Sequence, residues 1–317
     1  MCCPYSLLRV KLKEGNNLMR KYAIPNMRLG ATSFLLHETY VPAVRFAAER
    51  CDDVALLLVE PGEHSEYLAT PGEIAEIGRI IAGESATLHV HLPTDADFDT
   101  WQGARSMIGK IRRVAELTGP LDPHSFVLHV DFPSLHGTGG EPSAEQQEWT
   151  AEALREIAAC LPAPERLAVE NLETYAPSFW DRWLAGTPYS RCLDVGHIWK
   201  DGGDPAPVLA AWLPRVRVIH LHGLEPRGSE ADAAKPQGQQ RAPEKLAERN
   251  LSRLFGPRPR DHKSLRLMPP EFVDDVMHPL WKTGFSGVLN LEVFSVEDFT
   301  ASHAVLMHSW ERYAASF

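Results

Sequence analysis

Short apolar runs alternate along the chain with longer segments in which apolar residues recur at helical spacing. Eight short runs, rich in β-branched residues, predict strands at 27–33, 53–60, 86–92, 125–131, 166–172, 190–196, 216–222 and 287–293. The segments between them read as helices, several of which begin at a proline or a capping residue and end at glycine. This regular alternation predicts an α/β fold, a (β/α)8 TIM barrel. A doubly wound open sheet is the alternative, disfavoured because no glycine-rich nucleotide-binding sequence follows the first strand.

Two segments fall outside this alternation. Residues 1–26 lack a clear period and predict an N-terminal extension, either a loose arm or an over-long gene start, so that one barrel domain spans 27–317. Residues 225–260 are rich in proline, glutamine and charged residues, and predict a loop insertion after the seventh strand. In a barrel this loop would hang over the catalytic face, as a functional lid or as a disordered insertion.

Composition excludes several classes of protein. The formal net charge of −10 argues against the broad cationic surface that nucleic-acid binding requires. No run reaches the roughly 18 apolar residues of a membrane span, and the order of charges near the N-terminus is wrong for a signal peptide. The five cysteines form no metal-spaced set and no disulfide framework, which fits a reducing cytoplasm. We therefore expect a small-molecule partner, and neither nucleic acid nor a membrane.

Polar side chains gather at the carboxyl ends of the predicted strands, which meet at one rim of a barrel. They are His89, His91, His129, Asp131, Glu170, Asn171, Asp194, His197, His220, His222, Asp261, His262, Asn290 and Glu292. Burying such a set unpaired would cost about 2–7 kcal/mol for each neutral group and more for each charge. Metal cations supply the missing partner. Imidazole and carboxylate without thiolate suit Zn²⁺, Mn²⁺ or Fe²⁺, and about nine ligands leave room for two or three ions.

Seven motifs carry a family resemblance: "HVHLP", "VLHVD", "VENLE", "CLDVGH", "VIHLHG", "RDHKSL" and "LNLEVF". In this order they resemble the xylose isomerase-like barrel superfamily, and particularly its apurinic-endonuclease family two branch of metal-dependent phosphodiesterases. The resemblance implies the metal ligands His91, His129, Glu170, Asp194, His197, His220, Asp261, His262 and Glu292. The family has one residue between the Asp and His of the seventh loop, whereas Asp261 and His262 are adjacent here, which leaves the third metal position open.

Within this superfamily the motifs are similar to those of the cobamide-remodelling phosphodiesterases. That resemblance implies a hydrolase in which a metal-activated water cleaves the nucleotide-loop phosphodiester of a corrinoid substrate. For that mechanism we expect Glu170 and Glu292 as catalytic carboxylates, and His89, His222, Asp131 and Lys263 as candidates for contacts with substrate. His89 and His222 share a face with the expected ligands but lie one step deeper or shallower, so the alternative is that they fill the barrel. The alternatives are a sugar isomerase or epimerase, which uses one metal and paired glutamates to move a proton, a DNA-repair endonuclease, and a non-catalytic corrinoid-binding or metal-storage protein.

Overall fold

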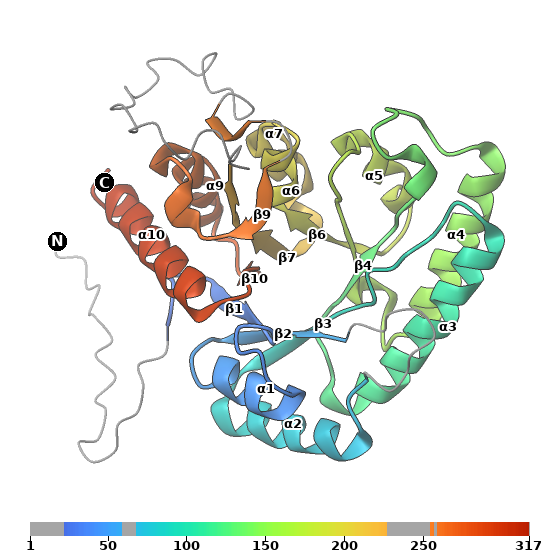
Figure 1. The fold of residues 1–317 in the computed structure, drawn as a ribbon, viewed down its shortest axis with the longest axis horizontal. Helices are drawn as coiled ribbons and strands as arrows, with labels where there is room; N and C mark the ends of the chain where they lie inside the picture. Colours follow the sequence, from blue (N-terminus) through green and yellow to red (C-terminus); the bar gives the residue numbers. More distant parts are fainter. Residues whose placement is uncertain (1–21, 59–67, 227–253, 257–258, 317) are drawn as a thin grey trace, which may run out of the picture.

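Eight parallel strands close into a barrel in the computed structural model, which describes residues 22–58, 68–226, 254–256 and 259–316. Around the barrel the order is β1-β10-β7-β6-β5-β4-β3-β2 (Figure 1). Their bounds are β1 (Arg28–Thr32), β2 (Asp53–Leu57), β3 (Thr87–His91), β4 (Phe126–His129), β5 (Leu167–Glu170), β6 (Ser190–Asp194), β7 (Val216–Leu221) and β10 (Val288–Leu291). Each lies within a predicted strand, and the predicted α/β barrel is confirmed.

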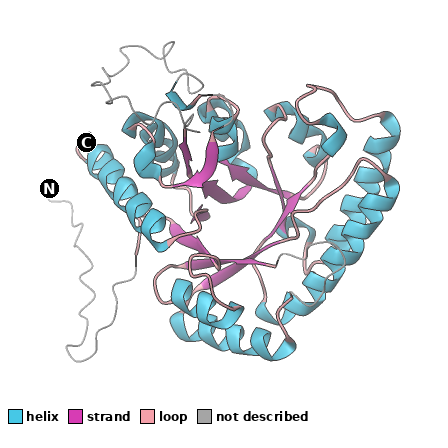
Figure 2. Ribbon diagram, viewed as in Figure 1, coloured by secondary structure: helices cyan, strands magenta, loops and turns pink. Residues whose placement is uncertain are grey.

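Helices surround the strands on the outside of the barrel (Figure 2). They are α1 (Tyr40–Ala48), α2 (Pro71–Glu84), α3 (Trp101–Thr118), α4 (Ala144–Ala159), α5 (Pro177–Leu184), α6 (Val195–Lys200), α7 (Pro205–Trp212), α9 (Pro270–Thr283) and α10 (Val296–Ala314). Their starts follow local chemistry: Thr70 and Glu73 form a capping box at the start of α2, and Pro71 occupies its first turn. Among the described residues, no helix is both long and apolar enough to cross a membrane.

A second, two-stranded sheet follows β7 and was not predicted. Strand β8 (Gly223–Glu225) pairs antiparallel with β9 (Arg260–Lys263), although the second segment was interpreted as the end of a polar loop. Gly223 permits this pairing, because a Cβ there would lie 2.3 Å from the carbonyl oxygen of Ser264. Most of the predicted insertion 225–260 and most of the predicted extension 1–26 lie outside the described residues, so the predictions for them stay predictions.

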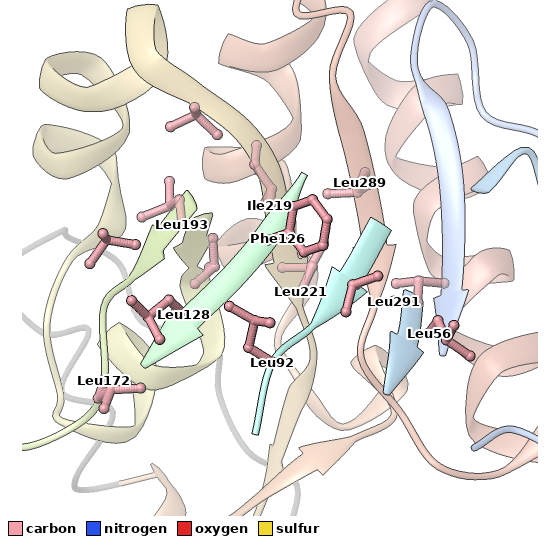
Figure 3. Packing of buried hydrophobic residues seen from close by; sticks show 14 of the residues in the cluster. Leu56, Leu92, Phe126, Leu128, Leu172, Leu193, Ile219, Leu221, Leu289 and Leu291 are labelled. Carbon is pink, nitrogen blue, oxygen red and sulfur yellow. The ribbon is translucent and has the colours of Figure 1, made fainter. Parts of the chain in front are cut away.

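Side chains on the strands alternate between two apolar layers. Leu289 and Leu291 on β10 belong to the outer layer between the strands and the helices, together with Phe126 (Figure 3). Val288, from the same strand as the two leucines, belongs to a fully buried inner cluster with Val127, Ala168, Cys192 and Val218. Because successive strand residues point to opposite faces, this inner cluster fills the barrel interior.

The register of the strands sets the height of each inward-pointing residue. His129 on β4 pairs with Glu170 on β5, and Asp194 on β6 pairs with His220 on β7. Each of these residues stands at or near the carboxyl end of its strand, so their side chains converge at one mouth of the barrel.

Replacing Leu289 with alanine tests the outer layer, because this side chain is fully buried. We expect the free energy of unfolding to fall by about 2–5 kcal/mol, since burial is lost and a cavity remains. Leu267 is 39% exposed and provides a matched control, whose alanine variant should change stability by about 0.5 kcal/mol or less. Urea unfolding measures both variants, and equal losses would contradict the place of Leu289 in the core.

Candidate functional site

The carboxyl mouth of the barrel holds a cavity of about 350 Å³. One wall is apolar and includes Phe34, Leu57 and Phe294. The polar side is lined by six of the residues that the sequence analysis singled out: His91, His129, Glu170, His197, His262 and Glu292. The predicted convergence of strand-end residues therefore produces a real concave site.

Glu170 is the centre of a first polar group at this mouth. Its Oε2 lies 3.3 Å from Nε2 of His91 and 3.2 Å from Nε2 of His129. Its Oε1 lies 3.2 Å from Nδ1 of His220, and Oε2 of Glu292 lies 3.1 Å from that same nitrogen. Two buried carboxylates thus face three imidazoles within one small volume.

Asp194 connects this first group to a second one. Its Oδ2 is buried, has no hydrogen-bond partner among the described residues, and lies 3.9 Å from Nδ1 of His220. Its Oδ1 accepts a hydrogen bond from the backbone N–H of His197 and lies 3.4 Å from Nε2 of His222. An unsatisfied carboxylate oxygen in the interior is costly, which marks this position as one that requires a cation.

The second group consists of His197, His222 and His262, whose ring nitrogens come close enough together to share an ion. His222 is fully buried and is absent from the residues that line the cavity. The backbone N–H of His262 donates to Nδ1 of His222, so the other nitrogen of His222 faces Asp194. The predicted contact between His222 and substrate remains a prediction. The position of the His222 ring suits a metal ligand or a partner of the Asp194 carboxylate.

Backbone carbonyls fix the orientation of two of these imidazoles. Nδ1 of His91 donates a hydrogen bond to the carbonyl of Leu92, and Nδ1 of His197 donates one to the carbonyl of Asn171. The donor–acceptor distance is 2.9 Å in each case. In a neutral His91 ring, the lone pair of Nε2 would then point at the carboxylate of Glu170. That arrangement is repulsive unless a proton or a metal ion lies between them.

The pKa shifts of the buried acids and imidazoles also indicate that this site needs positive charge. Burial by itself raises the carboxyl pKa of Glu170, but the facing imidazoles of His220 and His129 lower it well below its usual range. The carboxyl pKa of Glu292 is also well below its usual range, because the imidazole of His220 outweighs the effect of burial. Burial opposes protonation of His197, yet Asp194 and Glu170 raise its pKa to about 9. The site keeps its carboxylates ionised and must balance them with protons or a cation.

The spacing of the donor atoms fits a metal ion. Ligands at about 2.0–2.2 Å from a tetrahedral ion lie about 3.3–3.6 Å from one another. The contacts of the first group, from 3.1 to 3.3 Å, lie at the short end of this spacing. Deeper in the barrel, Asp53 meets His89 at 2.5 Å and His124 at 2.9 Å, which are hydrogen-bond distances. The contacts of the deeper cluster are therefore shorter than those of the first group.

His89 and Asp131, both predicted to contact substrate, do not line the cavity. His89 points inward two residues before His91, and its Nδ1 bonds to Asp53, so it lies deeper in the barrel. Asp131 accepts a hydrogen bond from the Tyr175 hydroxyl at 2.7 Å. The period of two left open whether His89 lies deeper or shallower than the expected ligands, and the structure places it deeper.

Asp261 and Lys263 are also held by other partners. The Lys200 ammonium contacts the Asp261 carboxylate, which was predicted to bind metal. Lys263 lies on β9 with its Nζ 3.7 Å from a carboxylate oxygen of Glu225. Neither residue lines the cavity. Their roles stay predictions.

Glu173 was missed as a site residue. Its Oε2 lies 3.5 Å from Nε2 of His197, and its Oε1 accepts from Lys200 at 2.8 Å. Burial raises the carboxyl pKa of Glu173, but His197 and Lys200 outweigh this and lower it. The signal was present, since Glu173 is the second acid of the quoted "VENLE" motif.

Comparisons with known proteins follow the fold. No family model matches the chain, and no curated protein matches its sequence. A crystal structure of a D-tagatose 3-epimerase-like protein matches with a TM-score of 0.63 and 16% identity, over 92% of this chain and 99% of that one. A structure of L-ribulose 3-epimerase gives a TM-score of 0.60 and 14% identity, over 92% and 96%. A xylose isomerase domain protein from Planctomyces limnophilus gives 0.59 and 11%, over 90% and 97%. The fold is that of the xylose isomerase-like barrels.

These structures correct the predicted function. They carry the names of sugar epimerases and of a xylose isomerase domain, and they favour the alternative reading over a phosphodiester hydrolase. The prediction of a cobamide-remodelling phosphodiesterase was wrong. It depended on short motifs that place candidate metal ligands at strand ends, and one fold can carry many different chemistries.

Replacing Gly196 with alanine tests the second group. A Cβ at this position would lie 2.0 Å from the His222 ring, so the imidazole must move. We expect the free energy of unfolding to fall by about 1–3 kcal/mol. Gly83 has open space around it, and its alanine variant should instead gain about 0.5–1 kcal/mol. Denaturant unfolding measures the free energy of unfolding of both variants. A Gly196→Ala variant as stable as the unmodified protein would contradict the close packing against His222.

Proposed function

We propose that this protein is a metal-dependent isomerase or epimerase of a small sugar. The observation that supports the proposal most strongly is the pair of buried carboxylates, Glu170 and Glu292, at 3.2 Å and 3.1 Å from Nδ1 of His220. Moving a proton off and back onto the carbon beside a carbonyl requires groups that accept and return it. Both carboxylates line the cavity where a substrate would meet them.

In this proposal four side chains hold one divalent cation: Glu170, Asp194, His220 and Glu292. Three carboxylates and one imidazole suit Mn²⁺, Fe²⁺ or Zn²⁺. When bound, the cation polarises the substrate oxygens and stabilises the negative charge that develops on them. The reaction needs this single ion, and further ions at the second group of histidines stay a prediction.

Side chains of the protein accept the proton from the substrate and return it. Because the pKa values of Glu170 and Glu292 lie well below their usual range, either carboxylate can accept the proton from the carbon beside the carbonyl at neutral pH. The electron pair of that C–H bond moves toward the carbonyl oxygen. Returning the proton to the former carbonyl carbon, while the hydroxyl proton moves to the former carbonyl oxygen, completes an isomerisation. An epimerisation instead takes a proton from solvent, passed by way of the second carboxylate to the opposite face of the same carbon, while the first carboxyl releases its proton to solvent. His91 and His129 hold the Glu170 carboxylate through its Oε2.

The cavity supports a monosaccharide-sized substrate. Its volume of about 350 Å³ is near the lower end of the roughly 300–1,000 Å³ of small-molecule sites. The apolar wall with Phe34 and Phe294 can cover the C–H face of a sugar, while the opposite wall offers hydrogen-bonding groups. A reducing cytoplasm belongs to the same proposal, since the described cysteines Cys51, Cys160 and Cys192 are free thiols.

Deuterium exchange tests the proton transfer. Metal-loaded protein is incubated in D₂O with a panel of ketoses and aldoses, and we expect deuterium at the carbon beside the carbonyl together with interconversion of isomers. Glu170→Gln and Glu292→Gln should each slow exchange about 10²- to 10⁴-fold, because an amide cannot accept the proton. Glu311→Gln, at an exposed position of α10, is the matched control. A panel that shows neither exchange nor interconversion would reject the proposal.

Chelation tests the cation. Removing metal should abolish activity and lower the melting temperature, because an ion at a hundred times its Kd adds about 2.7 kcal/mol to stability. Asp194→Asn should weaken metal binding at least tenfold, or about 1.4 kcal/mol, since it removes a charge from the ligand set. Elemental analysis and thermal melting measure both effects, with Glu311→Gln again as control. Full activity in chelated protein would contradict the metal dependence.

A further inference from the structure

A second polar centre lies toward the amino end of the barrel, and the proposed reaction does not use it. The carboxylate of Asp53 is fully buried and meets Nδ1 of His89 at 2.5 Å, Nε2 of His124 at 2.9 Å and the hydroxyl of Thr87 at 2.5 Å. Burial would raise the pKa of Asp53, but His89 and His124 lower it far below its usual range. The one negative charge of this centre is thus already shared between two imidazoles.

A cavity of about 650 Å³ opens at this end, nearly twice the volume of the one at the carboxyl mouth. Its lining includes the basic side chains of Arg28, Arg217 and His124, and no carboxylate among the described residues. Arg28 begins β1, so the cavity lies at the mouth opposite the metal ligands. Such a wall carries a surplus of positive charge.

Both arginines are held in place yet keep free donors. Arg28 donates to the Thr87 hydroxyl at 3.1 Å, and Arg217 donates to the backbone carbonyl of His124 at 2.8 Å. Neither forms an ion pair with a described carboxylate, and a guanidinium has five N–H donors. The hydroxyl of Ser286, also on the cavity wall, has no partner among the described residues. The cavity therefore presents oriented cationic donors without the anion that would normally satisfy them.

We propose that this cavity binds a phosphate group, either free or carried by a small molecule, through Arg28 and Arg217. A phosphate matches this wall because its oxygens accept paired N–H bonds from the planar guanidinium and its charge balances two arginines. The volume leaves room for the remainder of a phosphorylated molecule. The carbonyl ends of α7 and α9 also face this end and disfavour an anion, but their partial charges are smaller than the full charges of the arginines.

Calorimetric titration of the metal-loaded protein with inorganic phosphate, a hexose 6-phosphate and the uncharged hexose tests the site. We expect both phosphates to bind and Arg28→Gln and Arg217→Gln each to weaken them at least tenfold. Arg79→Gln, whose side chain is 73% exposed on α2, should leave binding unchanged. Tighter binding of the sugar phosphate would identify a phosphorylated metabolite as the ligand, and equal affinity would identify free phosphate. Undiminished phosphate binding in both variants would place the anion at the metal end and overturn the proposal.

A measurement on the unmodified chain guards against variants that fail to fold. Phenylglyoxal labels accessible arginines, and mass spectrometry locates them. Phosphate should protect Arg28 and Arg217 while Arg79 stays reactive. Labelling of Arg28 and Arg217 that phosphate does not alter would also overturn the proposal.

Discussion

The carboxylate of Glu170 is ionised although only 1% of this residue is exposed to solvent. A charge in that environment must be met by opposite charge at close range, because the cost of leaving it unpaired exceeds the whole stability of a typical domain. Three imidazoles within 3.3 Å meet this requirement only if protons or a cation are added, and the neighbouring carboxylate of Glu292 increases the need for positive charge. The arrangement of side chains at the carboxyl mouth reflects this need to balance the charge of Glu170. The barrel strands hold the imidazoles and carboxylates at fixed positions around it.

The barrel separates two polar centres with different chemistry. Glu170 and its histidines stand above an apolar inner cluster that includes Val127 and Val218, whereas Asp53 and His124 stand at the opposite end. Glu170 in the upper centre contacts its imidazoles at 3.2 to 3.3 Å, whereas Asp53 in the lower one contacts its imidazoles at 2.5 and 2.9 Å. His89 belongs to the lower centre, although its ring centroid is only 6.2 Å from that of His220. The same residue types therefore line a cavity at one end and form a buried hydrogen-bonded centre at the other.

The correction of the predicted function has a physical origin. Ligand motifs at strand ends specify which atoms can hold a cation, but they do not specify the shape of the space above it. That space is a cavity of about 350 Å³ with a wall formed by Phe34, Leu57 and Phe294, which suits a small substrate. A substrate class is thus a property of the assembled walls, contributed by segments far apart in the chain.

Local patterns in the sequence determined much of this protein. Apolar runs and helical spacing predicted all eight barrel strands, and the polar residues at their ends predicted the cluster of His91, His129, Glu170, His220 and Glu292. Tertiary structure decided the rest. Alternation along a strand tells which face a side chain occupies, but the height of His89 depends on the stagger between strands. The partner of Asp261 on β9 is Lys200, at the end of helix α6. The pairing of β9 with β8 likewise joins segments separated by more than thirty residues. Periodicity is a short-range property, whereas charge pairing and strand register are settled only when distant parts of the chain meet.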